Sequence, residues 1–284
     1  MVTTLLYDLP LEALCALVAI VFVGVYWIGT VALRPIFRSL VRSNGRDNEI
    51  VGSVVSSFGV LYGLLMSLIT VAAYQNMNDV KSKVEAEADS MLALYRYVGE
   101  YPSPQSEEIR SDLRDYCQRI INEEWPLLRK GQHPRGAHVY MNPIIMQLIS
   151  RDDHTERGKF IRDLSIEHYE EMANLGLERR NAAETAIPAV MWYVVFVGTL
   201  INFALMWSFD MRFLTQLFLG GLVAFFLGAL ILLIAVLERP YRSREFGISP
   251  NAFELTYNIM LEEATEPIPV TSTLTGGSLD DGEV

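Results

Sequence analysis

Apolar and charged residues are segregated along this chain of 284 residues. Four stretches are nearly free of charge and are long enough to cross a hydrocarbon layer of about 30 Å, which takes about 20 helical residues. These stretches are Leu11–Leu33, Val51–Tyr74, Ile187–Ser208 and Leu214–Leu237. The last two are joined only by Phe209–Phe213, and such a short connection predicts antiparallel neighbours. The pattern predicts four transmembrane helices.

The region between the second and third stretches, residues 75–186, has helical periodicity. One buried helical face is predicted by apolar residues at three-to-four spacing: Ile109, Leu113, Tyr116, Cys117, Ile120 and Ile121. Ser106 is expected to open this helix and Pro126 to end it near Trp125. A short apolar helix at Asn142–Ser150 follows, and Asp153 with Glu156 forms a capping signal for a third helix.

No segment of strand length alternates at period two, so the expected fold class is all-α. We expect an all-α membrane protein with four transmembrane helices as two hairpins and a helical soluble insert between spans two and three. The expected domains are the first hairpin (1–74), the insert (75–186), the second hairpin (187–237) and a cytoplasmic segment with a disordered acidic tail (238–284).

The second span carries a stripe of small and polar residues. The members recur at steps of three and four, which places them on one helical face: Gly52, Ser56, Gly59, Gly63, Ser67 and Thr70. No Pro or Gly interrupts Leu64–Val98, so one helix is expected to leave the membrane and end at Gly99–Pro102. We expect the same stripe to continue through Val80 and Val84.

Two interpretations of this stripe remain open. Small residues let membrane helices approach closely, so the face could pack against another helix. Alternatively, the face could line a water-filled pore, where hydroxyl groups and exposed backbone meet ions. In the pore interpretation the lining residues are Ser56, Gly59, Gly63, Ser67, Thr70, Val80 and Val84.

The net charge of −11 argues against nucleic acid as a partner, because phosphate binding needs clustered Lys and Arg. Positive charges near the spans bear on orientation. One set would be cytoplasmic if both termini and the insert are cytoplasmic: Lys81, Lys83, Arg179, Arg180, Arg239, Arg242 and Arg244. A slightly smaller set would then face outward: Arg34, Arg38, Arg42, Arg46 and Arg212. This difference favours cytoplasmic termini and a cytoplasmic insert.

No residue pattern indicates an enzyme, a metal site or a cofactor. The histidines are scattered and neither cysteine is paired with another ligand at metal-binding spacing. Glu85 and Asp89 share a helical face. The alternatives are that this charged face is simply exposed to solvent or that it forms a metal or gating site. Asn202 is a polar side chain inside the third span, where an inter-helix hydrogen bond or a place on a conduction path are the alternatives.

Several segments together resemble the bestrophin-like domain family of bacteria and plants. The matching segments cover most of residues 50–255: Phe58–Leu65 (FGVLYGLL), Glu85–Ala88, Tyr116–Leu128 (YCQRIINEEWPLL), Glu178–Trp192 (ERRNAAETAIPAVMW) and Glu238–Glu254 (ERPYRSREFGISPNAFE). The resemblance implies a four-span subunit with cytoplasmic termini, a homo-oligomer that is a pentamer as in bestrophins, and a pore lined by the second span.

Two departures limit what the resemblance implies. Bestrophins follow their last span with Asn-Pro-Phe-Gly and a dense acidic run that binds calcium, whereas Arg239–Glu254 has three arginines and two glutamates. We therefore expect no calcium site. Bestrophin necks also use bulky apolar rings, whereas this stripe offers Gly and Ser, so ion selectivity is not carried over.

The function expected from these observations is a subunit of a homo-oligomeric ion channel in the bacterial inner membrane. Its partners would be the lipid bilayer, other copies of the chain and inorganic ions, without nucleic acid or cofactors. The alternative is a non-conducting membrane scaffold or sensor whose helical insert binds a partner.

Overall fold

The computed structural model describes residues 11–40, 45–102, 104–134, 136–150, 154–182, 187–243 and 247–265. These residues form helices and no strand. The helices are α2 (Leu11–Leu40), α3 (Gly45–Gly99), α4 (Gln105–Arg119), η1 (Ile120–Glu124), α5 (Trp125–Arg129), α6 (Ala137–Ile149), α7 (Glu156–Asn181), α8 (Ala189–Trp207), α9 (Phe213–Leu237) and α10 (Asn251–Thr265). The predicted all-α class is confirmed for this part of the chain.

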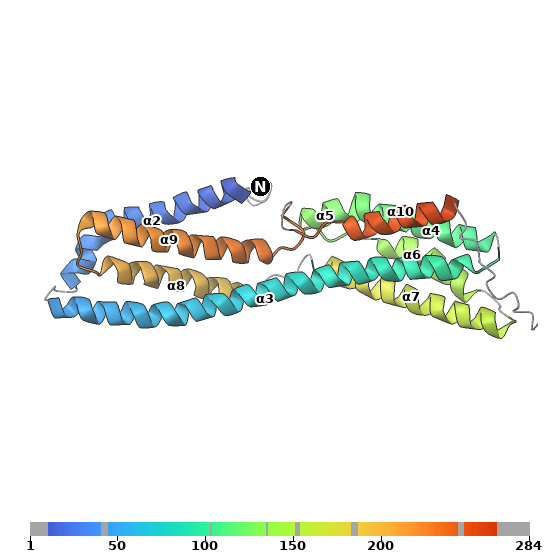
Figure 1. Cartoon of the computed structure of the whole chain (residues 1–284), viewed down its shortest axis with the longest axis horizontal. Coiled ribbons are helices and arrows are strands. Elements are labelled where there is room, and N and C mark those ends of the chain that lie inside the picture. Colours follow the sequence, from blue (N-terminus) through green and yellow to red (C-terminus); the bar gives the residue numbers. More distant parts are fainter. Residues whose placement is uncertain are drawn as a thin grey trace, which may run out of the picture.

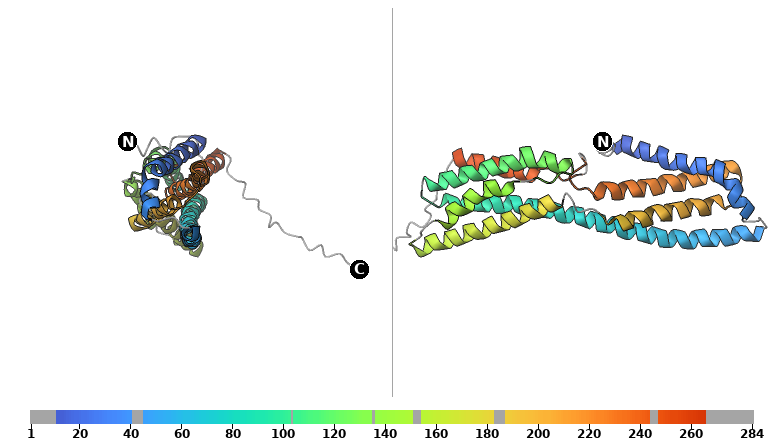
Figure 2. Two further views of the ribbon diagram at one scale, coloured as in Figure 1. Left: turned by 90° about the vertical axis from the view of Figure 1, so that its left-hand side faces the viewer. Right: turned by 180° about the vertical axis from the view of Figure 1, so that it is seen from behind.

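Helix α3 runs the whole length of an elongated molecule (Figure 1). Its 55 residues correspond to a length of about 80 Å at the helical rise. One half of it packs with α8 and α9, and the other half packs with α4, α7 and α10 (Figures 1 and 2). The expected unbroken helix through Val98 is therefore confirmed.

Four helices are long and apolar enough to cross a membrane, and they coincide with the predicted spans. The first two do not pack against each other as a hairpin. Helix α2 lies mainly against α9, and α3 lies against α8 and α9 (Figure 1). The expected arrangement as two hairpins is thus not confirmed, because α8 and α9 separate the first two spans.

Glycines allow large aromatic side chains to enter the contacts between the spans. A Cβ atom added at Gly198 of α8 would overlap the ring of Tyr62, and one added at Gly220 of α9 would overlap the ring of Tyr26. The Tyr62 hydroxyl group also donates to the Val195 carbonyl oxygen at 2.8 Å. Close packing and inter-helix hydrogen bonds hold membrane helices together, because lipid provides no hydrophobic driving force between them.

The insert has its own apolar core around Met91, Tyr95, Ile120 and Trp125. Pro126 does not end its helix near Trp125, as the sequence pattern predicted. The helix continues to Arg129 after a π-helical turn at Ile120–Glu124, and this wider turn lets the chain accommodate a residue without an N–H group.

The third helix of the insert is capped two residues later than the predicted capping signal at Asp153. The Thr155 side chain caps α7 and accepts a hydrogen bond from the Gly158 N–H group at 3.0 Å. Asp153 itself lies outside the described residues.

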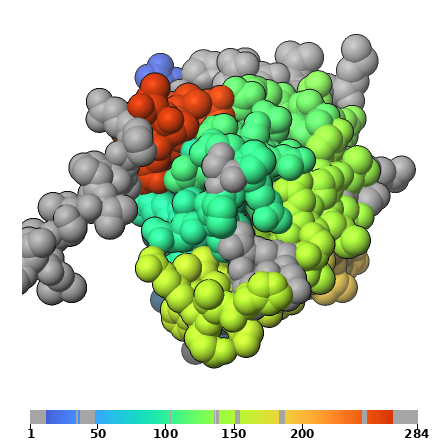
Figure 3. Space-filling model, turned by 90° about the vertical axis from the view of Figure 1, so that its right-hand side faces the viewer, coloured from blue at the N-terminus to red at the C-terminus, as the bar shows by residue number. Residues whose placement is uncertain are grey.

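Helix α10 follows the last span and belongs to the insert core, where Phe253 and Met260 are fully buried. Figure 3 shows the end of the insert, where α10 (red), the end of α3 (teal) and α7 (yellow-green) come together on one surface. Two acidic residues of the expected tail, Glu262 and Glu263, are in this helix. Residues 266–284, with the rest of that tail, lie outside the described residues.

Replacing Gly198 with Leu tests the packing between α3 and α8. Because the added side chain overlaps Tyr62, we expect the free energy of unfolding to fall by about 1–3 kcal/mol or more. Thermal unfolding of the detergent-solubilised protein measures this change. Gly24→Leu is the matched control, since no neighbouring atom lies within 4 Å of a Cβ added at Gly24. Equal melting temperatures for the two variants would contradict the packing described.

Candidate functional site

The predicted lining residues of the second span lie on the surface of α3. Ser56, Gly59, Gly63 and Ser67 are exposed, and Thr70 is half-buried. They share one face of the helix, while Tyr62 and other buried residues point toward α8 and α9. The structure therefore brings the membrane part of the predicted set together on one open face.

The two central glycines of this face do not serve packing within the protomer. A Cβ atom added at Gly59 or Gly63 would meet nothing within 4 Å. Gly198 and Gly220, in contrast, each accommodate a tyrosine ring. The small size of Gly59 and Gly63 is thus not required by packing within the protomer, and their face is open to another subunit, lipid or water.

Two hydroxyl groups of this face, those of Ser56 and Thr70, have hydrogen bonds within α3. Ser56 Oγ donates to the Gly52 carbonyl oxygen at 2.9 Å, and Thr70 Oγ1 donates to the Met66 carbonyl oxygen at 2.8 Å. Each hydroxyl oxygen keeps lone pairs that can accept hydrogen bonds from water. These groups are therefore stable inside an apolar layer and remain able to interact with a hydrated ion.

Val80 and Val84 do not belong to this open face. Their side chains are only 3% and 1% exposed and lie in the core of the insert. The expected continuation of the stripe through them is wrong for a single protomer. The reason is the helical period of α3. Val80 and Val84 lie about five turns after the buried residues Tyr62 and Met66, so they point in the same direction as these two and not in that of the exposed glycines.

Asn202 is buried in α8, as expected of a polar residue inside a span. Its amide nitrogen donates to the carbonyl oxygen of Gly198, one turn earlier in the same helix, at 3.4 Å. The recorded hydrogen bond thus stays within α8, and Asn202 lies off the exposed face of α3.

Sequence reasoning did not find a buried cluster of charges at the base of the insert. Arg179 of α7 donates from Nε to a Glu87 carboxylate oxygen of α3 at 2.7 Å, and from Nη2 to the Glu124 carboxylate of η1 at 2.7 Å. The side chains of Arg179 and Glu87 are fully buried. Arg180 lies 3.9 Å from the same Glu124 carboxylate.

Aromatic rings enclose this charge cluster. The guanidinium carbon of Arg179 lies 5.8 Å from the centre of the Trp125 ring and 5.5 Å from that of Phe253. The Tyr241 hydroxyl group, just after the last span, donates to the Arg179 carbonyl oxygen at 3.1 Å. The cluster therefore joins α3, η1, α7 and the chain leaving α9.

Complete burial raises the pKa of Glu87 above its ordinary value, and the neighbouring Arg179 opposes this shift. The two carboxylates in turn raise the pKa of Arg179, which stays charged. The sequence signal for this site was the position of Glu87, an acidic residue within the buried stripe between Val84 and Met91. Glu85 and Asp89, the acidic pair that the sequence pattern indicates as a metal or gating site or a solvated face, are both exposed.

The described residues contain no group of three or more His, Cys, Asp or Glu side chains that could hold a metal ion. Burial raises the pKa of the Cys117 thiol to about 12, so this side chain is not a thiolate near neutral pH. Cys117 lies in the core of the insert, where its Sγ donates to the Phe253 carbonyl oxygen. It is therefore a packing residue.

Replacing Arg179 with Met tests the buried charge cluster. We expect a loss of about 3–5 kcal/mol in the free energy of unfolding, because two buried carboxylates lose their counter-charge. Thermal unfolding of the whole protein in detergent measures this loss. Arg157→Met is the control: Arg157 pairs with Glu100 at 3.0 Å on the surface, where a pair contributes about 0–1 kcal/mol. Similar losses for both variants would show that the cluster does not hold the insert together.

The fold described here is similar to solved bestrophin homologs. Two point variants of a bacterial bestrophin homolog from Klebsiella pneumoniae give TM-scores of 0.64 and 0.63, at 13% and 14% identity. The matches cover 87% and 86% of this chain and 99% of each homolog. A further structure of that homolog gives a TM-score of 0.58 at 15% identity, covering 84% of this chain and 98% of the other. At these identities the likeness concerns the fold.

Sequence comparison gives the family. No curated protein matches the chain. The family model described as the bestrophin-like domain matches residues 20–253. This range begins within α2 and ends within α10, and it includes the other three spans and the whole insert. The chain therefore belongs to the bestrophin-like domain family.

Proposed function

We propose that this chain is a subunit of a homo-oligomeric ion channel whose pore is lined by α3. The observation that carries the proposal is the open face of α3 at Ser56, Gly59, Gly63 and Ser67, inside a helix apolar enough to span a membrane. Thr70 lies at its edge.

A face of glycine and serine gains little from contact with lipid. Acyl chains interact best with large apolar side chains, which occupy other exposed positions of the same span, such as Val60, Leu61 and Leu64. Exposed backbone and hydroxyl groups, in contrast, interact favourably with water and partly hydrated ions. A shared axis between copies of α3 would place such groups around a wet path.

Family membership supports an assembly of several copies. Bestrophins, which this chain resembles, are pentamers with the second span around the pore. We propose the same for this protein, in the bacterial inner membrane, with the insert and both termini in the cytoplasm. Its partners would be the lipid bilayer, identical subunits and inorganic ions. The proposal requires no enzyme activity and no cofactor.

Replacing Gly63 with Leu tests the pore directly. An isobutyl group from each subunit would narrow and dewet the path, so ion flux into liposomes should fall at least about tenfold while the oligomer stays intact. Size-exclusion chromatography in detergent reports the oligomer. Gly24→Leu is the matched control, because Gly24 lies in α2 and also has open space around it; its flux should equal that of the wild type.

Two outcomes would contradict the pore. If Gly63→Leu dissociates the oligomer, the face packs subunits together, because small residues there set the approach of the helices. If the wild-type oligomer is stable but passes no cation or anion, the protein is a non-conducting scaffold. In that case the helical insert would serve to bind a partner.

Fusion reporters test the proposed orientation. The comparison of positive charges that favours this orientation depends partly on the arginines of the first connection. Their side chains lie outside the part of the chain that the structure describes: Arg34, Arg38, Arg42 and Arg46. A reporter that fluoresces only in the cytoplasm should be active after Val284, and a phosphatase active only in the periplasm should be active at Arg46. Phosphatase activity at Gln132 in the insert would reverse the orientation.

A further inference from the structure

The rotation of α3 determines which residues continue the open face below the membrane. Eighteen residues make five turns of an α-helix, so residues that far apart point in the same direction. Lys81 comes 18 residues after Gly63, and Glu85 comes 18 residues after Ser67. Since α3 is continuous from Gly45 to Gly99, no break alters this relation.

Burial supports this assignment. Tyr62 and Met66 are 5% and 1% exposed, and the residues 18 positions later, Val80 and Val84, are 3% and 1% exposed. The buried face of α3 therefore keeps its direction from the spans into the insert. The open face must keep its direction as well, because both are faces of the same rigid helix.

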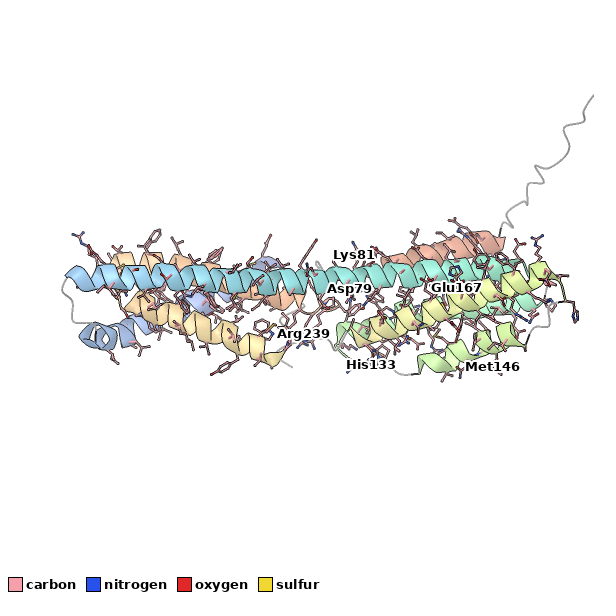
Figure 4. All side chains as sticks on the ribbon, turned by 90° about the horizontal axis from the view of Figure 1, so that it is seen from below. Asp79, Lys81, His133, Met146, Glu167 and Arg239 are labelled. Carbon is pink, nitrogen blue, oxygen red and sulfur yellow. The ribbon has the colours of Figure 1, made fainter. Side chains whose placement is uncertain are left out.

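Lys81 and Glu85 are exposed, in keeping with this direction. Their side chains are 60% and 56% exposed, and their charged atoms are 3.8 Å apart. They border a recess of about 420 Å³ that is also lined by Ser249, just before α10, and by Asn251 and Ala252 in its first turn. Figure 4 shows Lys81 midway along α3, near the level of Arg239, which follows the last span.

We propose that Lys81 and Glu85 line the cytoplasmic mouth of the pore and set its preference between cations and anions. This inference rests on the proposed channel function. In a symmetric oligomer, each residue forms a ring of like charge around the axis, and the two rings are one helical turn apart. Their charges nearly cancel in the wild type, so the loss of one leaves the other to act on passing ions.

The two neutralising variants should change selectivity in opposite directions. Lys81→Gln leaves a negative ring and should raise the permeability ratio of potassium to chloride, whereas Glu85→Gln should lower it. We expect changes of about two- to fivefold at 0.1 M salt, which shrink at 1 M because the screening length falls from about 10 Å to about 3 Å. The reversal potential across a planar bilayer under a KCl gradient measures the ratio.

The chain offers matched controls on another helix. Lys159 and Glu156 form a similar exposed pair at 2.9 Å in the first turns of α7. Lys159→Gln and Glu156→Gln make the same chemical changes there and should leave the reversal potential unchanged. The double exchange Lys81→Glu/Glu85→Lys keeps the net charge and tests whether both rings act at the same mouth; its ratio should stay within about twofold of the wild type.

The outcomes separate this inference from the channel itself. If the wild type conducts but Lys81→Gln and Glu85→Gln shift the reversal potential no more than the α7 controls, the charged mouth is wrong and the pore stands. Shifts of the same sign in both variants also overturn it. If the wild type does not conduct, both proposals fail. A gel-filtration profile like that of the wild type confirms that each variant is assembled.

Discussion

The continuity of α3 is the constraint on which the rest of the structure depends. One face of this 55-residue helix is buried at Tyr62 and Met66 between the spans and again at Val84 and Met91 in the insert. Both halves of the molecule are therefore built on the same side of one rod. The opposite side stays open along the membrane section, because its residues do not pack against other helices of the protomer.

Different forces hold the two halves to this rod. Between the spans, aromatic rings lie over glycines, and polar groups such as Tyr62 reach backbone oxygens of the next helix. Water is absent there, so close packing and hydrogen bonds replace the hydrophobic effect. In the insert, a conventional apolar core surrounds Trp125 and Ile120. The same helix can serve both because its buried face is mainly apolar, with Glu87 paired to Arg179 as the charged exception.

The junction between the halves is held by Arg179. This guanidinium group binds carboxylates from α3 and η1 while Tyr241, just after the last span, binds its carbonyl oxygen. A buried ion pair of this kind adds little net stability, yet losing one partner is costly. Its effect is to hold four segments in one arrangement at the place where α3 leaves the spans.

Hydrophobic length and helical period were enough to predict the four spans, the all-helical insert and the unbroken α3, because these are local properties. The membrane part of the open face was also predictable, since Gly and Ser recur at helical spacing. The continuation of this face beyond the spans was not predictable from the sequence. Val80 and Val84 looked like its continuation because apolar residues at three-to-four spacing do not reveal which partner covers them. The packing of α2 against α9, the α10 helix and the pairing of Arg179 with Glu87 and Glu124 likewise depend on contacts between residues far apart in the sequence. Only the tertiary structure decides these contacts, because burial on one side of a helix depends on neighbours that the local pattern does not specify.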